Sequence, residues 1–162
     1  MNIINVPLKY VPKQLNTKDK KKQVRMLKKS KELYSQNKYY TRDKVKSFSS
    51  KPSGHVKTAR RVYNIDKIQP NKQLAKATGC SVKSLKQIVK KGQGAYYSSG
   101  SRPNQTAHSW GIARLASAIT SGKSAIVDFH IIEKGCDHKK RAYKMAKEAK
   151  DKGMRKPVKI KV

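Results

Sequence analysis

The chain has 162 residues and carries 40 lysine and arginine residues against 9 aspartate and glutamate residues, a formal net charge of +31. Repulsion among so many like charges destabilises a compact fold unless a negative partner lies nearby. A hydrophobic share of 36% allows only a small core. No apolar run approaches the roughly 20 residues of a membrane span, and the start has no charged segment followed by a long apolar one. We therefore expect a protein that is neither secreted nor transmembrane.

The first half of the chain predicts an extended arm followed by short helices. Residues 1–16 contain Pro7 and Pro12 and predict the arm. A helix is expected over 18–36, capped by Thr17, with a sparse apolar stripe of Val24, Leu27 and Tyr34. Further helices are predicted over 56–63, 71–78 and 81–91.

The second half predicts a loop, a helix, a strand, a last helix and a tail. Glycines and a proline predict a loop over 92–105. A helix should follow to about 120, starting at Thr106 or Ser109, and its inner face should hold Trp110, Ala113, Leu115, Ala116 and Ile119. Residues 125–132 are apolar and β-branched and predict a buried strand. A helix over 137–152 should turn Ala142, Met145 and Ala149 inward. Within the tail, 153–162, the segment 156–162 alternates lysine with apolar residues as an edge strand or docking arm would.

These elements predict a mainly α fold with minor β, a small α+β domain. One basic domain, 17–152, should lie between the arm 1–16 and the tail 153–162. Its least charged stretch, 92–132, is the predicted place of the core because few charges interrupt it.

The segment 71–91 resembles a helix-turn-helix. Ala75 permits close helix crossing, Gly79 supplies the turn, and Ser81 would cap the second helix. In a DNA-reading version, Ser81, Lys83, Ser84 and Gln87 would face base edges and Lys86, Lys90 and Lys91 would meet phosphates. The alternative is a purely structural helical hairpin, which needs the same small and apolar positions.

The segment 92–106 combines glycines, hydroxyl side chains and the pair Tyr96-Tyr97. It would suit a phosphate cradle at the start of the next helix, with Arg102 adding charge and the tyrosines stacking. The alternative is an ordered packing loop whose tyrosines cover the core. The phosphate-binding P-loop pattern is absent from the sequence.

Catalysis and metal binding have weak sequence support, and we expect no enzyme, no cofactor and no metal. An enzymatic alternative would use His108, Arg114, Asp128 and His130, because Asp128 and His130 share one face of the predicted strand. A zinc alternative would combine Cys80, His130, Cys136 and His138, but their spacing matches no standard pattern. Two cysteines are too few for a secreted disulfide framework, so we expect reduced thiols.

The expected binding residues are cations in runs that few acids intersperse. Lysine outnumbers arginine, which favours charge neutralisation along phosphates or acidic surfaces over bidentate reading of bases. The predicted polyanion- or nucleic-acid-binding set is Lys20, Lys21, Lys22, Arg25, Lys28, Lys29, Arg60, Arg61, Lys83, Lys86, Gln87, Lys90, Lys91, Arg102, Lys139, Lys140 and Arg141.

Three stretches carry a resemblance to a known family. They are Gly79 to Gly92, then Gly94-Ala95-Tyr96-Tyr97-Ser98-Ser99-Gly100-Ser101-Arg102-Pro103-Asn104-Gln105-Thr106, then Ser109 to Ser117. They resemble an uncharacterised family of small Lys-rich proteins encoded by large double-stranded DNA viruses of algae and amoebae and by some phages. The resemblance covers about 10–136 and implies a setting, an abundant viral product packaged in the particle, but no residue roles.

The resulting expectation is a non-catalytic virion structural protein, made in the host cytoplasm and placed at the capsid interior or inner shell face. It would be a basic minor capsid or internal protein that bridges capsid proteins with acidic surfaces, and in addition DNA or an anionic internal membrane. No small-molecule substrate is expected. Two alternatives stay open: a DNA-binding packaging or regulatory protein that uses 71–91, and a nucleic-acid-processing enzyme.

Overall fold

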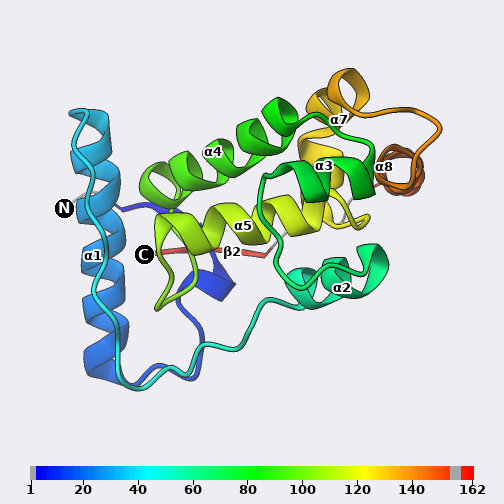
Figure 1. The fold of residues 1–162 in the computed structure, drawn as a ribbon. Helices are drawn as coiled ribbons and strands as arrows, with labels where there is room; N and C mark the ends of the chain where they lie inside the picture. Colours follow the sequence, from blue (N-terminus) through cyan, green and yellow to red (C-terminus); the bar gives the residue numbers. More distant parts are fainter. Residues whose placement is uncertain (1–2, 154–157) are drawn as a thin grey trace. The chain divides into compact units, whose positions relative to one another are not determined.

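A computed structural model describes residues 3–153 and 158–162 of the chain (Figure 1). The described residues form a mainly helical protein with one small antiparallel sheet, which confirms the predicted fold class. They divide into two compact units. Unit 1 comprises 3–51, 93–110 and 158–162, and unit 2 comprises 52–92 and 111–153. The proposed boundaries of arm, domain and tail stay a prediction.

Unit 1 is built around the long helix α1, Thr17–Ser35. Asn16, rather than the predicted Thr17, caps this helix, because its side chain accepts a hydrogen bond from the Asp19 N–H at 2.8 Å. The segment after α1 reverses direction and runs back along the helix (Figure 1). It is held there by hydrogen bonds such as Ser47 N–H to the Asp19 carboxylate at 2.8 Å.

The two ends of the described chain pair with each other in unit 1. Strand β1, Asn5–Pro7, lies antiparallel to β2, Lys159–Lys161, with Val6 opposite Ile160. A short 3₁₀ helix, η1, follows over Leu8–Tyr10. The arm and the adjoining faces form a hydrophobic cluster of Val6, Tyr10, Val11, Leu15, Met26, Leu27 and Val45. The strand predicted for the tail is thus confirmed over 159–161, while residues 154–157 of the tail lie outside the described residues.

Unit 2 is a set of helices around an aliphatic core. Its complete helices are α2 (Gly54–Tyr63), α3 (Lys72–Thr78), α6 (Lys123–Val127), α7 (Phe129–Gly135) and α8 (Arg141–Lys152). The chain passes between the two units within α4 (Val82–Ser98) and α5 (Ala107–Ala118). The largest fully buried aliphatic side chains of this core are Leu74, Leu85, Ile88, Leu115, Ile119 and Ile132.

Two of the predicted elements are wrong. Residues 125–132 form parts of α6 and α7 instead of a strand, and Ala125, Phe129 and Ile132 are buried at helical spacing while Val127 is 48% exposed. Residues 92–98 continue α4 instead of forming a loop. Glycine is required at position 92 of this helix because a Cβ there would lie 2.6 Å from the Gly111 Cα. The missing side chain lets α4 and α5 touch.

Candidate polyanion-binding surfaces

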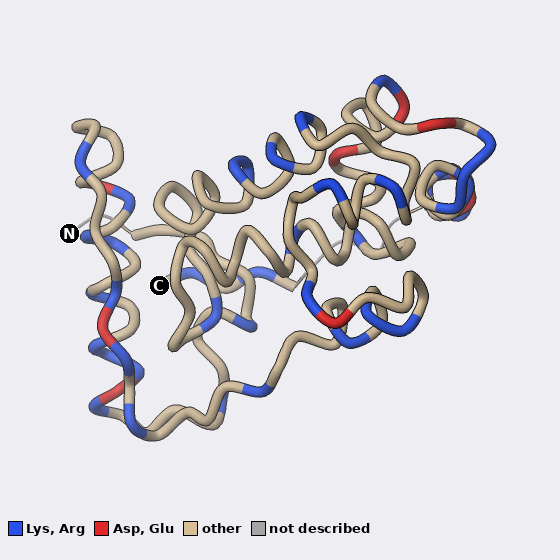
Figure 2. The backbone as a smooth tube through the Cα atoms, viewed as in Figure 1, with Lys and Arg blue, Asp and Glu red and all other residues tan. Residues whose placement is uncertain are grey.

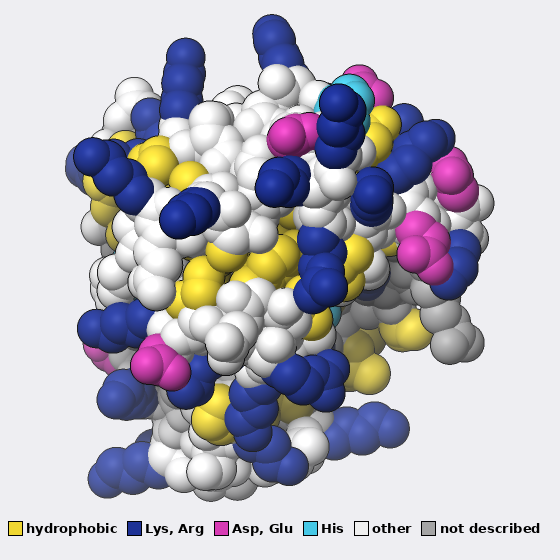
Figure 3. All heavy atoms as spheres, turned by 45° about the vertical axis from the view of Figure 1, so that its right-hand side comes forward, with side chains coloured by type: hydrophobic (Ala, Val, Ile, Leu, Met, Phe, Trp, Pro, Cys, Tyr) yellow, Lys and Arg dark blue, Asp and Glu magenta, His cyan; other side chains and the backbone are white. Residues whose placement is uncertain are grey.

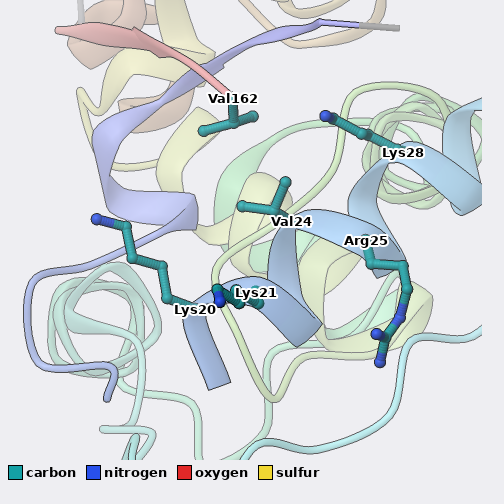
Figure 4. A pocket seen from close by; sticks show the side chains of 6 residues that line it. All are labelled: Lys20, Lys21, Val24, Arg25, Lys28 and Val162. Atoms are coloured by element: carbon teal, nitrogen blue, oxygen red, sulfur yellow. The ribbon is translucent and has the colours of Figure 1, made fainter. Parts of the chain in front are cut away.

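An open groove of about 400 Å³ runs along one side of α1 in unit 1 (Figure 4). The residues that line it are Lys20, Lys21, Val24, Arg25, Lys28 and Val162. Because the α1 residues recur at intervals of three and four, they fall on one side of the helix. In Figure 4 the Val24 and Val162 side chains lie opposite each other, with Lys20 and Lys28 on either side. The groove is therefore lined by two apolar and four cationic side chains.

The groove charges have no acidic partner among the described residues. The acidic residues that form ion pairs among the described residues are Asp128, Glu148 and Asp151, and all three belong to unit 2. The buried Asp19 of α1 is engaged elsewhere, because hydrogen bonds from Ser47 hold it on the far side of the helix and keep the pKa of its carboxyl below the ordinary value. Such cations attract an external anion.

Two of the cations predicted on α1 lie outside the groove. The Lys22 ammonium donates to the Lys44 carbonyl at 3.3 Å, and the Lys29 ammonium lies 4.6 Å from the centre of the Tyr40 ring. Both therefore interact with the segment that runs back along α1. The predicted α1 set is thus divided between the groove and this second side.

A second cationic surface follows α4 in unit 2. Lys83, Lys86, Gln87 and Lys90 are all exposed, and their spacing of i, i+3, i+4 and i+7 places them along one face. Basic positions recur along both α1 and α4 in Figure 2. Lys91 differs from the others, because its ammonium lies 3.0 Å from the Asp128 carboxylate. We call the four exposed residues the α4 ridge.

The helix-turn-helix pattern is confirmed as local structure, but one predicted contact is wrong. Gly79 ends α3 with φ of +82°, and Ser81 caps α4 by accepting from the Ser84 N–H at 3.1 Å. Ser84, predicted to face bases, is buried, and a Cβ on Gly135 would collide with its hydroxyl. It packs against α7 and is closed to a DNA groove.

The turn between α3 and α4 is also covered by the segment that joins α7 to α8. The Ser81 N–H donates to the Gly135 carbonyl at 2.9 Å, and the Asp137 N–H donates to the Gly79 carbonyl at 2.8 Å. A Cβ on Gly79 would lie 2.5 Å from the Lys140 side chain. Reading helices enter the major groove with their first turn, and here protein covers the turn before that helix, while Ser81 and Lys83 stay exposed.

The remaining predicted cations lie at several places. Arg60 and Arg61 are exposed on the last turn of α2, and the Arg141 guanidinium of α8 donates to the Val62 carbonyl at 2.8 Å. Lys139 and Lys140 are exposed just before α8, and Arg102 is exposed in the loop before α5. The structure therefore gathers part of the predicted set into the groove and the ridge, and leaves these residues outside both.

The segment 92–106, which we call the Tyr96 string, makes the contacts expected of a packing segment around Tyr96. The Arg42 guanidinium, 6% exposed, lies 3.8 Å from the centre of the buried Tyr96 ring and donates to the Tyr96 carbonyl at 2.8 Å. It also donates to the hydroxyls of Ser30 and Ser101. Burial lowers the pKa of Arg42. This buried cation and its neutral partners tie the string to α1.

The start of α5 is capped by its own side chains. The Ser109 N–H donates to the Thr106 hydroxyl at 3.0 Å, and the Thr106 N–H donates to the Ser109 hydroxyl at 2.9 Å. The predicted phosphate cradle would have used this end of the helix. The reciprocal cap supplies the partners that a phosphate would otherwise offer.

Two residues of the enzymatic alternative, Arg114 and Asp128, form an ion pair in unit 2. Asp128 is fully buried and accepts hydrogen bonds from Arg114 at 2.8 Å on both carboxylate oxygens. Burial opposes its charge, but Arg114 and Lys91 outweigh that effect and hold the pKa of Asp128 below its ordinary value. His108 and His130 are exposed. The expectation that Asp128 and His130 share a strand face is wrong, because Asp128 lies between α6 and α7 and His130 lies in α7.

The two cysteines are joined, which corrects the expectation of reduced thiols. Cys80 and Cys136 form a disulfide in unit 2, next to an antiparallel backbone bridge between the same residues. This bond occupies both sulfur atoms of the zinc alternative, which is therefore wrong for this state. In the part of the chain that the structure describes, histidine, cysteine and acidic side chains form no group of three suited to a metal.

The model of DUF5824, a family of unknown function, matches residues 7–134. The chain belongs to this family. The match covers the α1 residues of the groove and the whole α4 ridge, and it leaves α8 and β2 outside. Comparison with curated proteins and with solved structures finds no match. The family therefore groups this chain with its relatives without supplying an activity.

Sequence reasoning missed the apolar part of the groove. Val24 was expected in a buried stripe, but it is half-buried at the groove, while Gln23 and Met26 are buried beside Leu27. The spacing of Lys20, Val24 and Lys28 was an available signal. No sequence signal indicated Val162, because its place depends on pairing between the two ends of the described chain.

No described helix is long and apolar enough to span a bilayer.

Proposed function

We propose that this protein is a non-enzymatic structural protein that binds nucleic acid as a polyanion through lysine-rich helix faces. The α1 groove carries this proposal, because it gathers four cations without an acidic partner among the described residues. The α4 ridge adds a second row of exposed amine and amide donors. Lysine ammonium groups are hydrated point charges that suit phosphates without selecting a base.

The proposed setting is the particle of a large double-stranded DNA virus. The resemblance of the Tyr96 to Thr106 string to Lys-rich viral proteins supports this setting, and so does the charge excess. On the face shown in Figure 3, basic side chains stand out from the surface with few acidic ones between them. Such a surface would tie genome, acidic capsid proteins or an anionic internal membrane together. Detection of the protein in purified particles tests the setting, and its absence from them would contradict it.

Binding to random duplex DNA should be tight at low salt and steeply salt-dependent. Contact with about eight phosphates would make the logarithm of affinity fall with the logarithm of salt concentration at a slope near −7. The measurement is a fluorescence anisotropy titration at several salt concentrations, with polyglutamate as the acidic control polymer.

The comparison with polyglutamate distinguishes the candidate roles. Similar affinities and slopes for both polymers support charge-driven bridging between particle components. A DNA preference that persists as salt rises would favour a shaped nucleic-acid site and the packaging or regulatory alternative. Absence of measurable binding to either polymer at low salt would contradict the proposal.

A further inference from the structure

Three tyrosine rings form a cluster at the end of α1 in unit 1. Tyr34 and Tyr97 lie parallel, with planes 7° apart and centres separated by 6.3 Å. The Tyr39 ring centre lies 5.0 Å from that of Tyr97 and 6.1 Å from that of Tyr34. Tyr39 is 72% exposed. An aromatic ring that packs on other rings yet stays this open has a free surface for a further planar group.

The backbone fixes this cluster from both sides. Asn37 adopts a left-handed conformation with φ of 61°, and the Lys38 N–H donates to the Leu33 carbonyl at 2.8 Å, so the chain turns Tyr39 back against α1. The Tyr97 carbonyl accepts a hydrogen bond from the Ser30 hydroxyl at 3.0 Å. Tyr97 also packs edge-on against Tyr96, the ring that is buried beneath Arg42. The cluster is therefore set in place before any ligand arrives.

Charge around the cluster favours an anionic ligand. Lys38 precedes Tyr39 directly, and Lys31 lies one turn before Tyr34 on the same side of α1; both lysines are exposed. Glu32 is two residues from Tyr34 and therefore falls on a different side of the helix. Aromatic rings beside basic side chains suit single-stranded nucleic acid, whose bases stack while its phosphates meet the cations.

We propose that Tyr34, Tyr39 and Tyr97 form a base-stacking platform for single-stranded nucleic acid, with Tyr39 as the ring that contacts a base. This inference deepens the proposed function and rests on it, because it adds unpaired strands to the polyanions that the protein binds. A duplex hides the faces of its bases within the stack, so the platform would select frayed, looped or unwound segments. Stacking tolerates any base and requires no sequence preference.

The test compares a thymidine oligomer with an abasic oligomer of the same length, about 12 nucleotides, which lies within the usual range of site sizes. The two carry the same phosphates, so a difference in affinity reports the bases. We expect the wild type to prefer the thymidine oligomer by roughly 5- to 100-fold. Tyr39→Ala should remove most of that preference and leave affinity for the abasic oligomer unchanged. Tyr39→Phe keeps an aromatic ring at the same position and should retain the preference.

Each other outcome overturns the inference in a recognisable way. Equal binding of the two oligomers by the wild type would mean that phosphates alone are recognised. A preference that survives Tyr39→Ala would place base contact elsewhere and leave Tyr39 free for a protein partner. Failure of the wild type to bind either oligomer or duplex DNA would overturn the proposed function together with the platform. Because Tyr39 is so exposed, Tyr39→Ala should fold normally, which circular dichroism checks.

Discussion

Replacing Asp128 with alanine is expected to lower the free energy of unfolding by about 3–5 kcal/mol. The carboxylate is fully buried and forms ion pairs with Arg114 at 2.8 Å and with Lys91 at 3.0 Å. Its removal takes away the carboxylate whose two oxygens accept hydrogen bonds from the Arg114 guanidinium. Urea denaturation followed by circular dichroism measures the change. Asp66→Ala is the matched control, because Asp66 is an exposed acid of the same unit, and its loss should change stability by no more than about 0.5 kcal/mol.

The effect of Asp128 should depend on pH in a defined direction. Because the pKa of the folded carboxyl lies below its ordinary value of 3.8, its contribution is complete above that value and is lost as pH falls through the folded pKa. The stability gap between the wild type and Asp128→Asn should therefore be constant near neutral pH and narrow in acid. A gap that widened in acid would contradict the ion-pair account.

Reduction of the Cys80–Cys136 disulfide is expected to lower the free energy of unfolding by about 4 kcal/mol, the chain-entropy value for a loop closed over this sequence separation of 56 residues. The bond joins the α3–α4 turn to the end of α7, so its loss frees two parts of unit 2 from each other in the unfolded chain. Denaturation with and without a phosphine reductant measures the effect.

The variant in which both cysteines are replaced by serine is the control for that experiment. Its stability should match that of the reduced wild type and should not respond to the reductant. Titration of the non-reduced, denatured wild type with a thiol reagent should find no free thiol. Two titratable thiols, or identical unfolding with and without reductant, would contradict the disulfide.

Local sequence signals were sufficient for most helices. The glycine after α3 and the serine before α4 act within a few residues of the boundaries that they set. The strand prediction for 125–132 was wrong because the apolar residues there fit both the helical period and the strand period. Burial of Ala125, Phe129 and Ile132 follows the helical period, and the exposed Val127 breaks the alternation that a strand requires.

Contacts between distant residues explain the other errors. Gly92 and Gly94 have low helix propensity, but close packing of Gly92 against Gly111 overrides it. Pairing of Cys80 with Cys136 depends on how α7 reaches the α3–α4 turn, which neither cysteine's neighbours encode. The residues of the candidate site also fall into a part that local spacing predicts and a part that it does not. Helical spacing predicts the cations of the groove and the ridge, whereas Val162 and the tyrosine cluster depend on tertiary structure.

We propose that the α1 groove binds nucleic acid more strongly than the protein's general charge would. The most direct test replaces Lys20, Lys21, Arg25 and Lys28 with glutamine and measures the salt dependence of duplex DNA binding. Its control replaces Lys57, Lys67, Lys72 and Lys76, which are exposed cations outside the proposed surfaces, so both variants lose the same charge. We predict that the groove variant binds DNA more weakly at low salt, with a log–log slope shallower by roughly 3 to 4. The control should stay close to the wild type, and equal changes in the two variants would contradict the groove.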